Sequence, residues 1–327
     1  MGAMRDVNSE AVVAMDISGR SLLTLKDYTR GEIEHLIDLA ISLKTEAEAG
    51  DRKQRLIGYS LALLFEKRST RTRCAFETAF GEEGGHPVFL SGQDIHLGVK
   101  EDLADTARVL GRMFDCIQFR GFKQETAEGL ARHSGVPVYN GLTDIYHPTQ
   151  ALADLMTVKE VFGDLSGRRI AYIGDGRNNV ARSLMIISAK LGAHCIIGTP
   201  EELSPDEQTL GYCREVAIGT GGSVTVSHSP TEAVADAYAI YTDVWASMGE
   251  EAEAKQRAAL LSPYQVTTDL MQASGRTDTI FLHCLPAVKG QEMTEEVFES
   301  TASRVFDQAE NRKHTIKALM LATLGLV

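Results

Sequence analysis

Leu61-Ala62-Leu63-Leu64-Phe65 is a wholly apolar run, and Ser69-Thr70-Arg71-Thr72-Arg73 follows it after a short charged segment. An apolar run of this length is typical of a strand that is buried on both faces. Beyond Ser69 the apolar residues recur at helical spacing, until Gly81 and the Gly84-Gly85 pair end the pattern. These residues are Ala75, Phe76, Ala79 and Phe80. The segment therefore predicts a strand that leads into a helix, which is half of a βαβ unit.

The same alternation of short apolar runs and amphipathic stretches continues along the chain. Further strands are expected at 116–119, 136–139, 169–174, 195–198, 224–227, 239–243 and 279–283. Long helices are expected at about 148–162, 179–191 and 309–324. This order of elements predicts an α/β fold with mostly parallel sheets flanked by helices.

The length of the chain predicts two domains of similar size. Its 327 residues are about twice the roughly 150 residues that are typical of one domain. The glycine-containing segment Phe162–Gly167 separates the two series of expected strands. We expect a first domain at residues 1–150 and a second at 151–308.

Composition and charge exclude several classes of partner. The formal net charge of −12 argues against nucleic acid, because binding to a phosphate backbone requires a basic surface. No stretch approaches the roughly 18 consecutive apolar residues of a membrane-spanning helix, and residues 1–21 lack the layout of a secretory signal. We therefore expect neither nucleic acid nor a membrane as a partner.

The cysteines predict a reducing compartment, and we expect the cytoplasm. They are scattered, odd in number and form no C-x-x-C pair, which indicates free thiols rather than disulfides or a structural zinc site. They are Cys74, Cys116, Cys195, Cys213 and Cys284. No metal site and no organic cofactor is predicted.

The Ser69–Arg73 stretch predicts an anion site. A helix N-terminus presents unpaired backbone N–H groups and the positive end of the helix dipole. Three hydroxyls and two guanidiniums within five residues add donors that match the oxygens of a phosphate. Two arginines in a first helical turn oppose the dipole, which favours a bound anion over a purely structural Ser cap.

This stretch, extended to Phe65–Arg73, also resembles the carbamoyl phosphate loop of the aspartate/ornithine carbamoyltransferase family. Four further stretches resemble that family in its own order along the chain. They are Phe119-Arg120-Gly121, His147-Pro148-Thr149-Gln150-Ala151-Leu152-Ala153-Asp154, Asp243-Val244-Trp245-Ala246-Ser247-Met248-Gly249-Glu250 and His283-Cys284-Leu285-Pro286. Each alone is a weak signal, but five in order are very specific.

The resemblance implies transfer of a carbamoyl group from carbamoyl phosphate to the side-chain amine of L-ornithine, which yields L-citrulline and phosphate in arginine metabolism. It implies no cofactor and a homotrimer as the assembly. In this interpretation Ser69, Thr70, Arg71 and Thr72 hold the phosphate. The carbamoyl oxygen would accept hydrogen bonds from Arg120, His147 and Thr72, an oxyanion-hole arrangement.

Further residues of the carbamoyl phosphate site follow from the resemblance. Gln150 would bind the carbamoyl nitrogen, and Leu285 and Cys284 would contact the same substrate. His96, in the glycine-punctuated loop 91–98, would reach across a subunit interface to the neighbour's phosphate. Arg312 would return to the phosphate or the carbonyl, so that the C-terminal helix, about 309–327, packs on the first domain.

The ornithine half is predicted from the second domain. Asp243 ends an expected strand, where ligand groups gather in open α/β sheets, and its carboxylate suits the α-ammonium of ornithine. The resemblance assigns Asn179 to the amino-acid end of ornithine and Ser247 and Met248 to a loop that closes over it. Ordinary packing is the favoured role for Trp245, and Arg182 stands where many relatives have a small polar residue.

Cys284 has two possible roles. A neighbouring His283 is compatible with a Cys–His nucleophile. Adjacent strand residues point to opposite faces, however, so contact between Cys284 and the reacting amine is favoured over covalent catalysis.

Three other functions are compatible with parts of the sequence. A related carbamoyltransferase could act on putrescine, aspartate or an N-acylated ornithine; putrescine would leave Asn179 and the Ser247-Met248 loop without a purpose. Gly174-Asp175-Gly176, after a strand and before a helix, also fits a nicotinamide-dependent oxidoreductase, but the third glycine of that fingerprint is replaced by Asn179. A non-catalytic relative that binds a partner is disfavoured because each expected catalytic position is filled.

Overall fold

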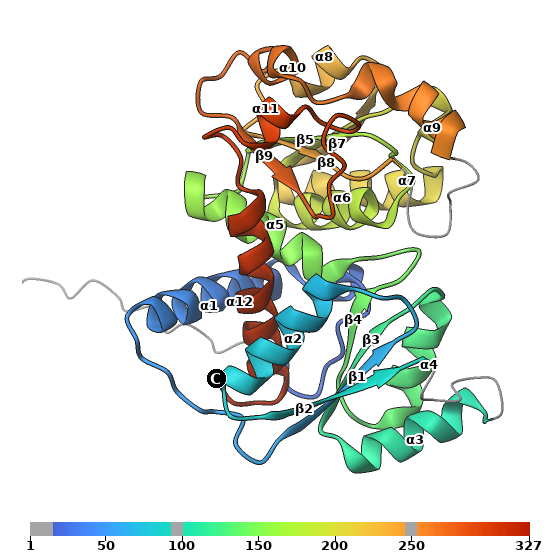
Figure 1. Ribbon diagram of the computed structural model, residues 1–327, viewed down its shortest axis with the longest axis vertical. Helices are drawn as coiled ribbons and strands as arrows, with labels where there is room; N and C mark the ends of the chain where they lie inside the picture. Colours follow the sequence, from blue (N-terminus) through green and yellow to red (C-terminus); the bar gives the residue numbers. More distant parts are fainter. Residues whose placement is uncertain (1–15, 93–100, 246–253) are drawn as a thin grey trace, which may run out of the picture.

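Two parallel sheets form the two halves of the molecule (Figure 1). The computed structural model describes residues 16–92, 101–245 and 254–327. The first sheet has the strand order β2-β1-β3-β4 and the second the order β7-β6-β5-β8-β9, and every pairing is parallel. The predicted α/β fold with two domains of helix-flanked parallel sheets is therefore confirmed.

The strands fall close to their expected positions. They are β1 (Ser60–Phe65), β2 (His86–Ser91), β3 (Cys116–Arg120), β4 (Val138–Leu142), β5 (Arg169–Ile173), β6 (His194–Gly198), β7 (Ser223–Ser227), β8 (Ala239–Thr242) and β9 (Ile280–His283). Leu63 of β1 lies between Phe89 of β2 and Gln118 of β3. Because β1 has a neighbour on each side and helices on each face, its sequence is continuously apolar.

The helices connect these strands and cover both sheets. The α-helices are α1 (Arg30–Glu48), α2 (Thr70–Glu82), α3 (Leu103–Met113), α4 (Gln124–Ser134), α5 (Pro148–Phe162), α6 (Asn179–Leu191), α7 (Glu207–Thr220), α8 (Pro230–Val234), α9 (Ala254–Leu261), α10 (Thr268–Gln272), α11 (Glu295–Phe298) and α12 (Val305–Thr323). Short 3-10 helices lie at Leu25–Asp27, Glu201–Leu203 and Ser262–Tyr264. Among the described residues, no helix is both long and apolar enough to span a bilayer.

Two strands of the first sheet differ from the expectation. Strand β2 was not predicted. It is an edge strand whose side chains are mostly half-buried, so its sequence shows neither an apolar run nor a clear alternation of apolar and polar residues. Strand β4 begins at Val138 and runs on through Asn140 and Gly141, beyond the expected range of 136–139. The expected range stopped short because Asn140 and Gly141 are not apolar; the buried Asn140 amide donates to the Leu23 carbonyl at 2.9 Å.

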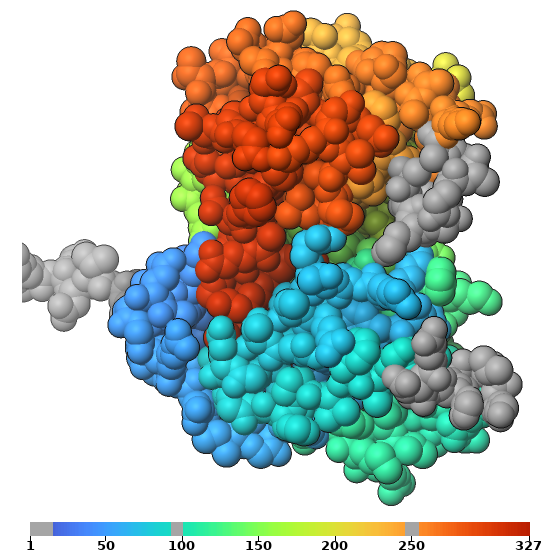
Figure 2. Space-filling view, in the orientation of Figure 1, coloured from blue at the N-terminus to red at the C-terminus, as the bar shows by residue number. Residues whose placement is uncertain are grey.

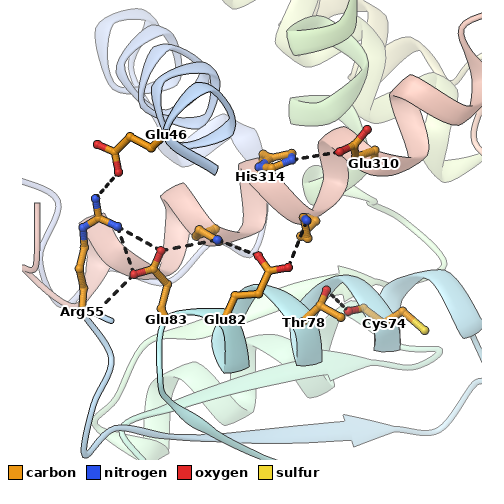
Figure 3. Close-up of polar contacts among 10 residues, drawn as sticks. Glu46, Arg55, Cys74, Thr78, Glu82, Glu83, Glu310 and His314 are labelled. Carbon is orange, nitrogen blue, oxygen red and sulfur yellow. Dashed lines mark hydrogen bonds and ion pairs between the residues drawn. The ribbon is translucent and has the colours of Figure 1, made fainter. Parts of the chain in front are cut away.

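The C-terminal helix returns to the first half of the chain. Helix α12 packs on α1, α2 and α5, and in Figure 2 the red C-terminal segment lies between the blue and cyan surfaces of the first half. Lys313 and Lys317 of α12 donate to Glu82 at the end of α2, at 3.2 and 2.9 Å. Arg55 pairs with the adjacent Glu83, as Figure 3 shows. The pairs from Lys313 and Lys317 join α12, which carries Arg312, to the end of α2.

Candidate active site

The N-terminus of α2 lies at the carboxyl edge of the first sheet. Ser69 is the N-cap residue, and its hydroxyl accepts from the backbone N–H of Thr72 at 3.2 Å. Arg120 ends β3 and is the register partner of Phe65, which ends β1. Carboxyl ends of parallel strands meet at one edge of a sheet, so the helix N-terminus and Arg120 converge there.

Thr72 joins two arginines that are far apart in sequence. Its Oγ1 accepts from the Arg120 guanidinium at 3.2 Å and from the Arg312 guanidinium at 2.9 Å. A hydroxyl has two acceptor lone pairs and one hydrogen. Because the arginines can only donate, the Thr72 hydrogen is left to donate to a ligand.

Three guanidiniums lie in this part of the structure and repel one another electrostatically. Arg120 and Arg312 are only 7% and 2% exposed, and Arg71 is half-buried. Burial, with repulsion from Arg312 and Arg71, lowers the pKa of Arg120 to about 9. Burial and Arg71 likewise lower the pKa of Arg312 to about 10. An anion among these groups would relieve both the repulsion and the lost hydration, so the cluster suits a phosphate.

His147 faces the same cluster in its neutral form. Burial, followed by Arg312, Arg120 and Arg71, lowers the pKa of His147 well below its usual value. It occupies the N-cap position of α5, yet its side chain makes no cap hydrogen bond, and its Nδ1 has no partner among the described residues. A neutral imidazole has one N–H to donate, which suits a carbonyl oxygen better than it suits capping.

Gln150 and Gln118 add buried amides to this end of the site. Gln150 follows Pro148 in the first turn of α5, and its Oε1 is buried without a partner in the described chain. Gln118 of β3 has neither amide atom paired there, and it was missed from sequence. A Cβ on Gly141 would lie 2.5 Å from Gln118 Nε2 and 3.0 Å from Thr72 Cγ2, so a larger residue there would displace these side chains. The presence of a glutamine within a mostly apolar strand could have identified Gln118 as a candidate site residue.

The second domain contributes Asp243 and Cys284 from the carboxyl ends of β8 and β9. The Cys284 thiol donates to Asp243 Oδ1 at 2.9 Å, and the Val244 N–H donates to the same oxygen at 2.8 Å. Burial raises the pKa of Asp243, and burial together with Asp243 raises that of Cys284 well above its usual value. Burial lowers the pKa of Arg71, and Cys284 and Asp243 oppose this shift electrostatically, so Arg71 is close enough to interact with the Asp243–Cys284 pair.

A Cys–His nucleophile is not supported by this geometry. His283 Nε2 lies 3.1 Å from the buried Glu292 carboxylate, and its Nδ1 accepts from the Leu285 N–H at 2.8 Å. Both ring nitrogens are thus engaged away from Cys284, whose thiol is held protonated. The ligand atoms of Asp243, His283 and Cys284 lie within 4.8 Å of one another, but the engaged imidazole leaves no free nitrogen for a metal ion.

The two asparagines at the start of α6 have different neighbours. Asn179 Nδ2 donates to the Thr143 carbonyl of the first domain at 2.6 Å. Asn178 caps α6 and donates to Asp243 Oδ2 at 3.3 Å, so the structure brings Asn178 beside the carboxylate. From the sequence, Asn179 and not Asn178 was expected in the ornithine site. Arg182 pairs with Asp206 at 2.9 Å.

Leu285 and Trp245 are the remaining predicted residues that the structure describes. Leu285 lies in a tight turn at φ 58°, followed by a cis bond to Pro286, which is an uncommon backbone conformation for leucine. Trp245 is buried in the core cluster of the second domain, which agrees with the packing role expected for it. His96, Ser247 and Met248 lie outside the described residues.

Comparisons with known proteins cover both halves of the chain. The family models "Aspartate/ornithine carbamoyltransferase, carbamoyl-P binding domain" and "Aspartate/ornithine carbamoyltransferase, Asp/Orn binding domain" match residues 20–160 and 166–323. The ornithine carbamoyltransferase of Caldanaerobacter subterraneus subsp. tengcongensis is 62% identical over 312 residues, which are 95% of this chain and 100% of the relative. The catabolic ornithine carbamoyltransferase of Staphylococcus aureus is 53% identical over 95% of this chain and 97% of its own. The solved structure of ornithine carbamoyltransferase from Pyrococcus furiosus has a TM-score of 0.92 and 46% identity, and covers 95% of this chain and 99% of that one.

Proposed function

The chain belongs to the aspartate/ornithine carbamoyltransferase family, and from this we propose that it is an enzyme that carbamoylates L-ornithine. It transfers the carbamoyl group of carbamoyl phosphate to the side-chain amine, giving L-citrulline and phosphate, a reaction of arginine metabolism. The observation that carries this function is the buried cluster of Arg71, Arg120 and Arg312 around Thr72, opposite the Asp243–Cys284 pair.

The cationic cluster binds the donor substrate. Ser69, Thr70, Arg71 and Thr72 hold the phosphate at the helix N-terminus, and His96 of a neighbouring subunit adds to it. As the carbonyl becomes tetrahedral, its oxygen gains charge and accepts from Thr72, Arg120 and neutral His147. Donors placed in this way are each commonly worth about 3–4 kcal/mol in the transition state. Arg312 supports Thr72 and reaches the phosphate or the carbonyl, and Leu285 lies beside the carbamoyl group with Gln150.

The opposite wall prepares the amine. An alkylamine with a pKa near 10.4 is only about one part in 2,500 neutral at pH 7. The buried site disfavours the ammonium form by desolvation, while Asp243 binds the α-ammonium and Cys284 contacts the reacting nitrogen. Asn179, Ser247 and Met248 complete the ornithine site. Attack on the carbonyl carbon then expels phosphate into the arginine cluster, and alignment of two substrates supplies much of the rate.

An acceptor-specificity assay tests this function. Purified protein is given carbamoyl phosphate with L-ornithine, putrescine or L-aspartate, and each carbamoylated product is measured. Turnover with ornithine alone is expected. Preferred turnover of putrescine would support the proposed carbamoyl phosphate site and contradict the proposed ornithine site. No turnover with any acceptor would contradict the proposal that the protein is an enzyme.

The assembly and location belong to the same proposal. We propose a cytoplasmic homotrimer whose domains are 1–150 with 309–327, and 151–308. A mixing experiment tests whether sites are shared between subunits, using His96→Ala and Asp243→Asn variants that are each inactive. Hybrid trimers reassembled from the two should recover activity, because some sites then combine an intact His96 with an intact Asp243. No recovery would reject a shared site.

A further inference from the structure

Gln150 and Asp154 form a buried pair one turn apart on α5. Both are about 1% exposed, and Gln150 Nε2 donates to Asp154 Oδ1 at 2.8 Å. Residues four apart on a helix lie on the same face, which permits this contact. The oxygen of Asp154 can only accept here, so the Gln150 amide must turn its NH2 toward Asp154 and its carbonyl away from it.

The carbonyl oxygen of Gln150 is therefore the atom offered to the ligand. Gln150 Oε1 is buried and has no hydrogen-bond partner among the described residues. The carbamoyl group ends in an NH2, which requires an acceptor. A flipped Gln150 would present a second NH2 and would repel the substrate.

The same oxygen of Asp154 also orients a second amide. Gln308 Nε2, on α12, donates to Asp154 Oδ1 at 2.6 Å. Gln308 Oε1 then accepts from the backbone N–H of His283 at 2.9 Å. His283 directly precedes Cys284, so this contact reaches the opposite wall of the site.

We propose that Asp154 is a positioning residue that orients both amides, Gln150 toward the carbamoyl NH2 and Gln308 toward the backbone before Cys284. One carboxyl oxygen thus connects the donor half of the site on α5 with the acceptor half after β9. This role rests on the proposed function, because Gln150 is given its ligand there.

An acceptor oxygen is what this role requires, and not a negative charge. Gln150 and Gln308 both donate to Oδ1 and neither uses Oδ2, so an NH2 in place of Oδ2 would leave the Oδ1 contacts intact. Burial raises the pKa of Asp154 to about 7, against hydrogen bonds from Gln150, Gln308 and Tyr241 that favour the ionised form. Both forms are therefore present near neutral pH, and Oδ1 accepts in each when the proton of the neutral form lies on Oδ2. Asp154→Asn should therefore preserve the orientation of both glutamines, and Asp154→Ala should lose it.

Two phosphonates that differ only at the critical group provide the test. Phosphonoacetamide carries an NH2 and 2-oxopropylphosphonate carries a methyl group in its place, and the Kd of each is measured by calorimetry. The unmutated protein should prefer the amide. In Asp154→Ala this preference should fall about tenfold, the factor expected for one hydrogen bond between neutral groups. In Asp154→Asn it should stay within about threefold of the unmutated value.

A matched control separates positioning from packing. One turn further along the same two helices, Asn311 donates to Thr157 Oγ1 at 3.0 Å. Thr157→Val removes this α5–α12 hydrogen bond without touching Gln150, so it should lower thermal stability and leave the amide preference unchanged. In a Gln150→Ala background, Asp154→Ala should cause no further loss of preference.

The second arm is tested independently with Gln308→Met, which also serves if Asp154→Ala does not fold. This variant keeps the Gln150–Asp154 contact, so the amide preference should remain, while the KM for ornithine rises and kcat falls. An unchanged preference in Asp154→Ala, a loss of preference in Asp154→Asn, or unchanged ornithine kinetics in Gln308→Met would overturn the proposal. Citrulline formation by the unmutated protein tests the underlying function separately.

Discussion

The Arg312 guanidinium donates to the Thr72 hydroxyl at 2.9 Å, although 240 residues separate them in the chain. Arg120 donates to the same oxygen, so Thr72 has both lone pairs engaged and its hydrogen available. A hydroxyl prepared in this way needs no reorganisation when charge develops on a substrate oxygen, which is the condition for effective electrostatic catalysis.

Thr72→Val should therefore lower kcat/KM for carbamoyl phosphate by about 10²–10³-fold, because it removes one donor to the developing oxyanion. Steady-state kinetics with both substrates measure this, and the KM for ornithine should change little. Thr78→Val is the matched control on the same helix, since Thr78 is exposed and bonds only to the Cys74 carbonyl in Figure 3. Equal losses in both variants would contradict the role of Thr72.

Inorganic phosphate should stabilise the protein through the arginine cluster. At 100 times its Kd a ligand specific for the folded state adds about 2.7 kcal/mol, which corresponds to several degrees in Tm. Arg312→Met should lose most of this shift, because one of three cations that hold the anion is gone. Differential scanning fluorimetry with and without phosphate is the measurement, at constant ionic strength.

Lys313→Met serves as the control for that experiment. Lys313 is adjacent on α12 but pairs with Glu82 outside the cluster, so its variant should retain the phosphate shift. If Arg312→Met and Lys313→Met respond alike, the phosphate does not bind among the arginines.

Asp154 should make the stability of the protein depend on pH with a defined sign. Burial raises its pKa from 3.8 to about 7, so the folded state holds a proton that the unfolded chain has released. This contribution is fully present below about pH 4 and is lost as pH rises toward 7, with a total on the order of a few kcal/mol. Above pH 7 it changes no further.

Asp154→Asn cannot titrate and should isolate this effect. Denaturant unfolding of both proteins at pH 4.5, 5.5, 6.5, 7.5 and 8.5 gives the difference in free energy of unfolding. The Asn variant should gain relative to the unmutated protein up to pH 7 and then level off. A difference that is independent of pH would show that the carboxyl is not perturbed.

Cys284→Ser should retain measurable turnover, with kcat lowered by about 10–100-fold. The thiol is held protonated beside Asp243, so it acts by contact with the amine, and a serine hydroxyl can replace part of that contact. Loss of a covalent nucleophile would instead cost about 10⁴-fold or more. Pre-steady-state release of phosphate distinguishes the two, since a carbamoyl-enzyme would release a burst of phosphate before citrulline forms, in the unmutated protein only.

The order of elements was largely predictable from local sequence. A strand with neighbours on both sides and helices on both faces is mostly apolar, so β1, β5 and β8 stand out as runs, and helix α6 was predicted at its observed bounds. Edge strand β2 was missed because a half-exposed strand has no such constraint. Short motifs such as Ser69–Arg73 carry their chemistry locally, since a helix N-terminus and its cap are made by consecutive residues.

What only the tertiary structure decided is which distant groups meet. Periodicity states that a side chain is buried, but not which partner it finds when α12 packs between α1, α2 and α5. The pairing of Arg312 with Thr72, the choice of Asn178 beside Asp243, and the amide orientations set by Asp154 all depend on that packing. The sequence by itself thus determined the elements, the fold class and the family, because these follow from local patterns. The directed hydrogen bonds of the site arose from packing, because each requires donor and acceptor to be brought together from separate elements.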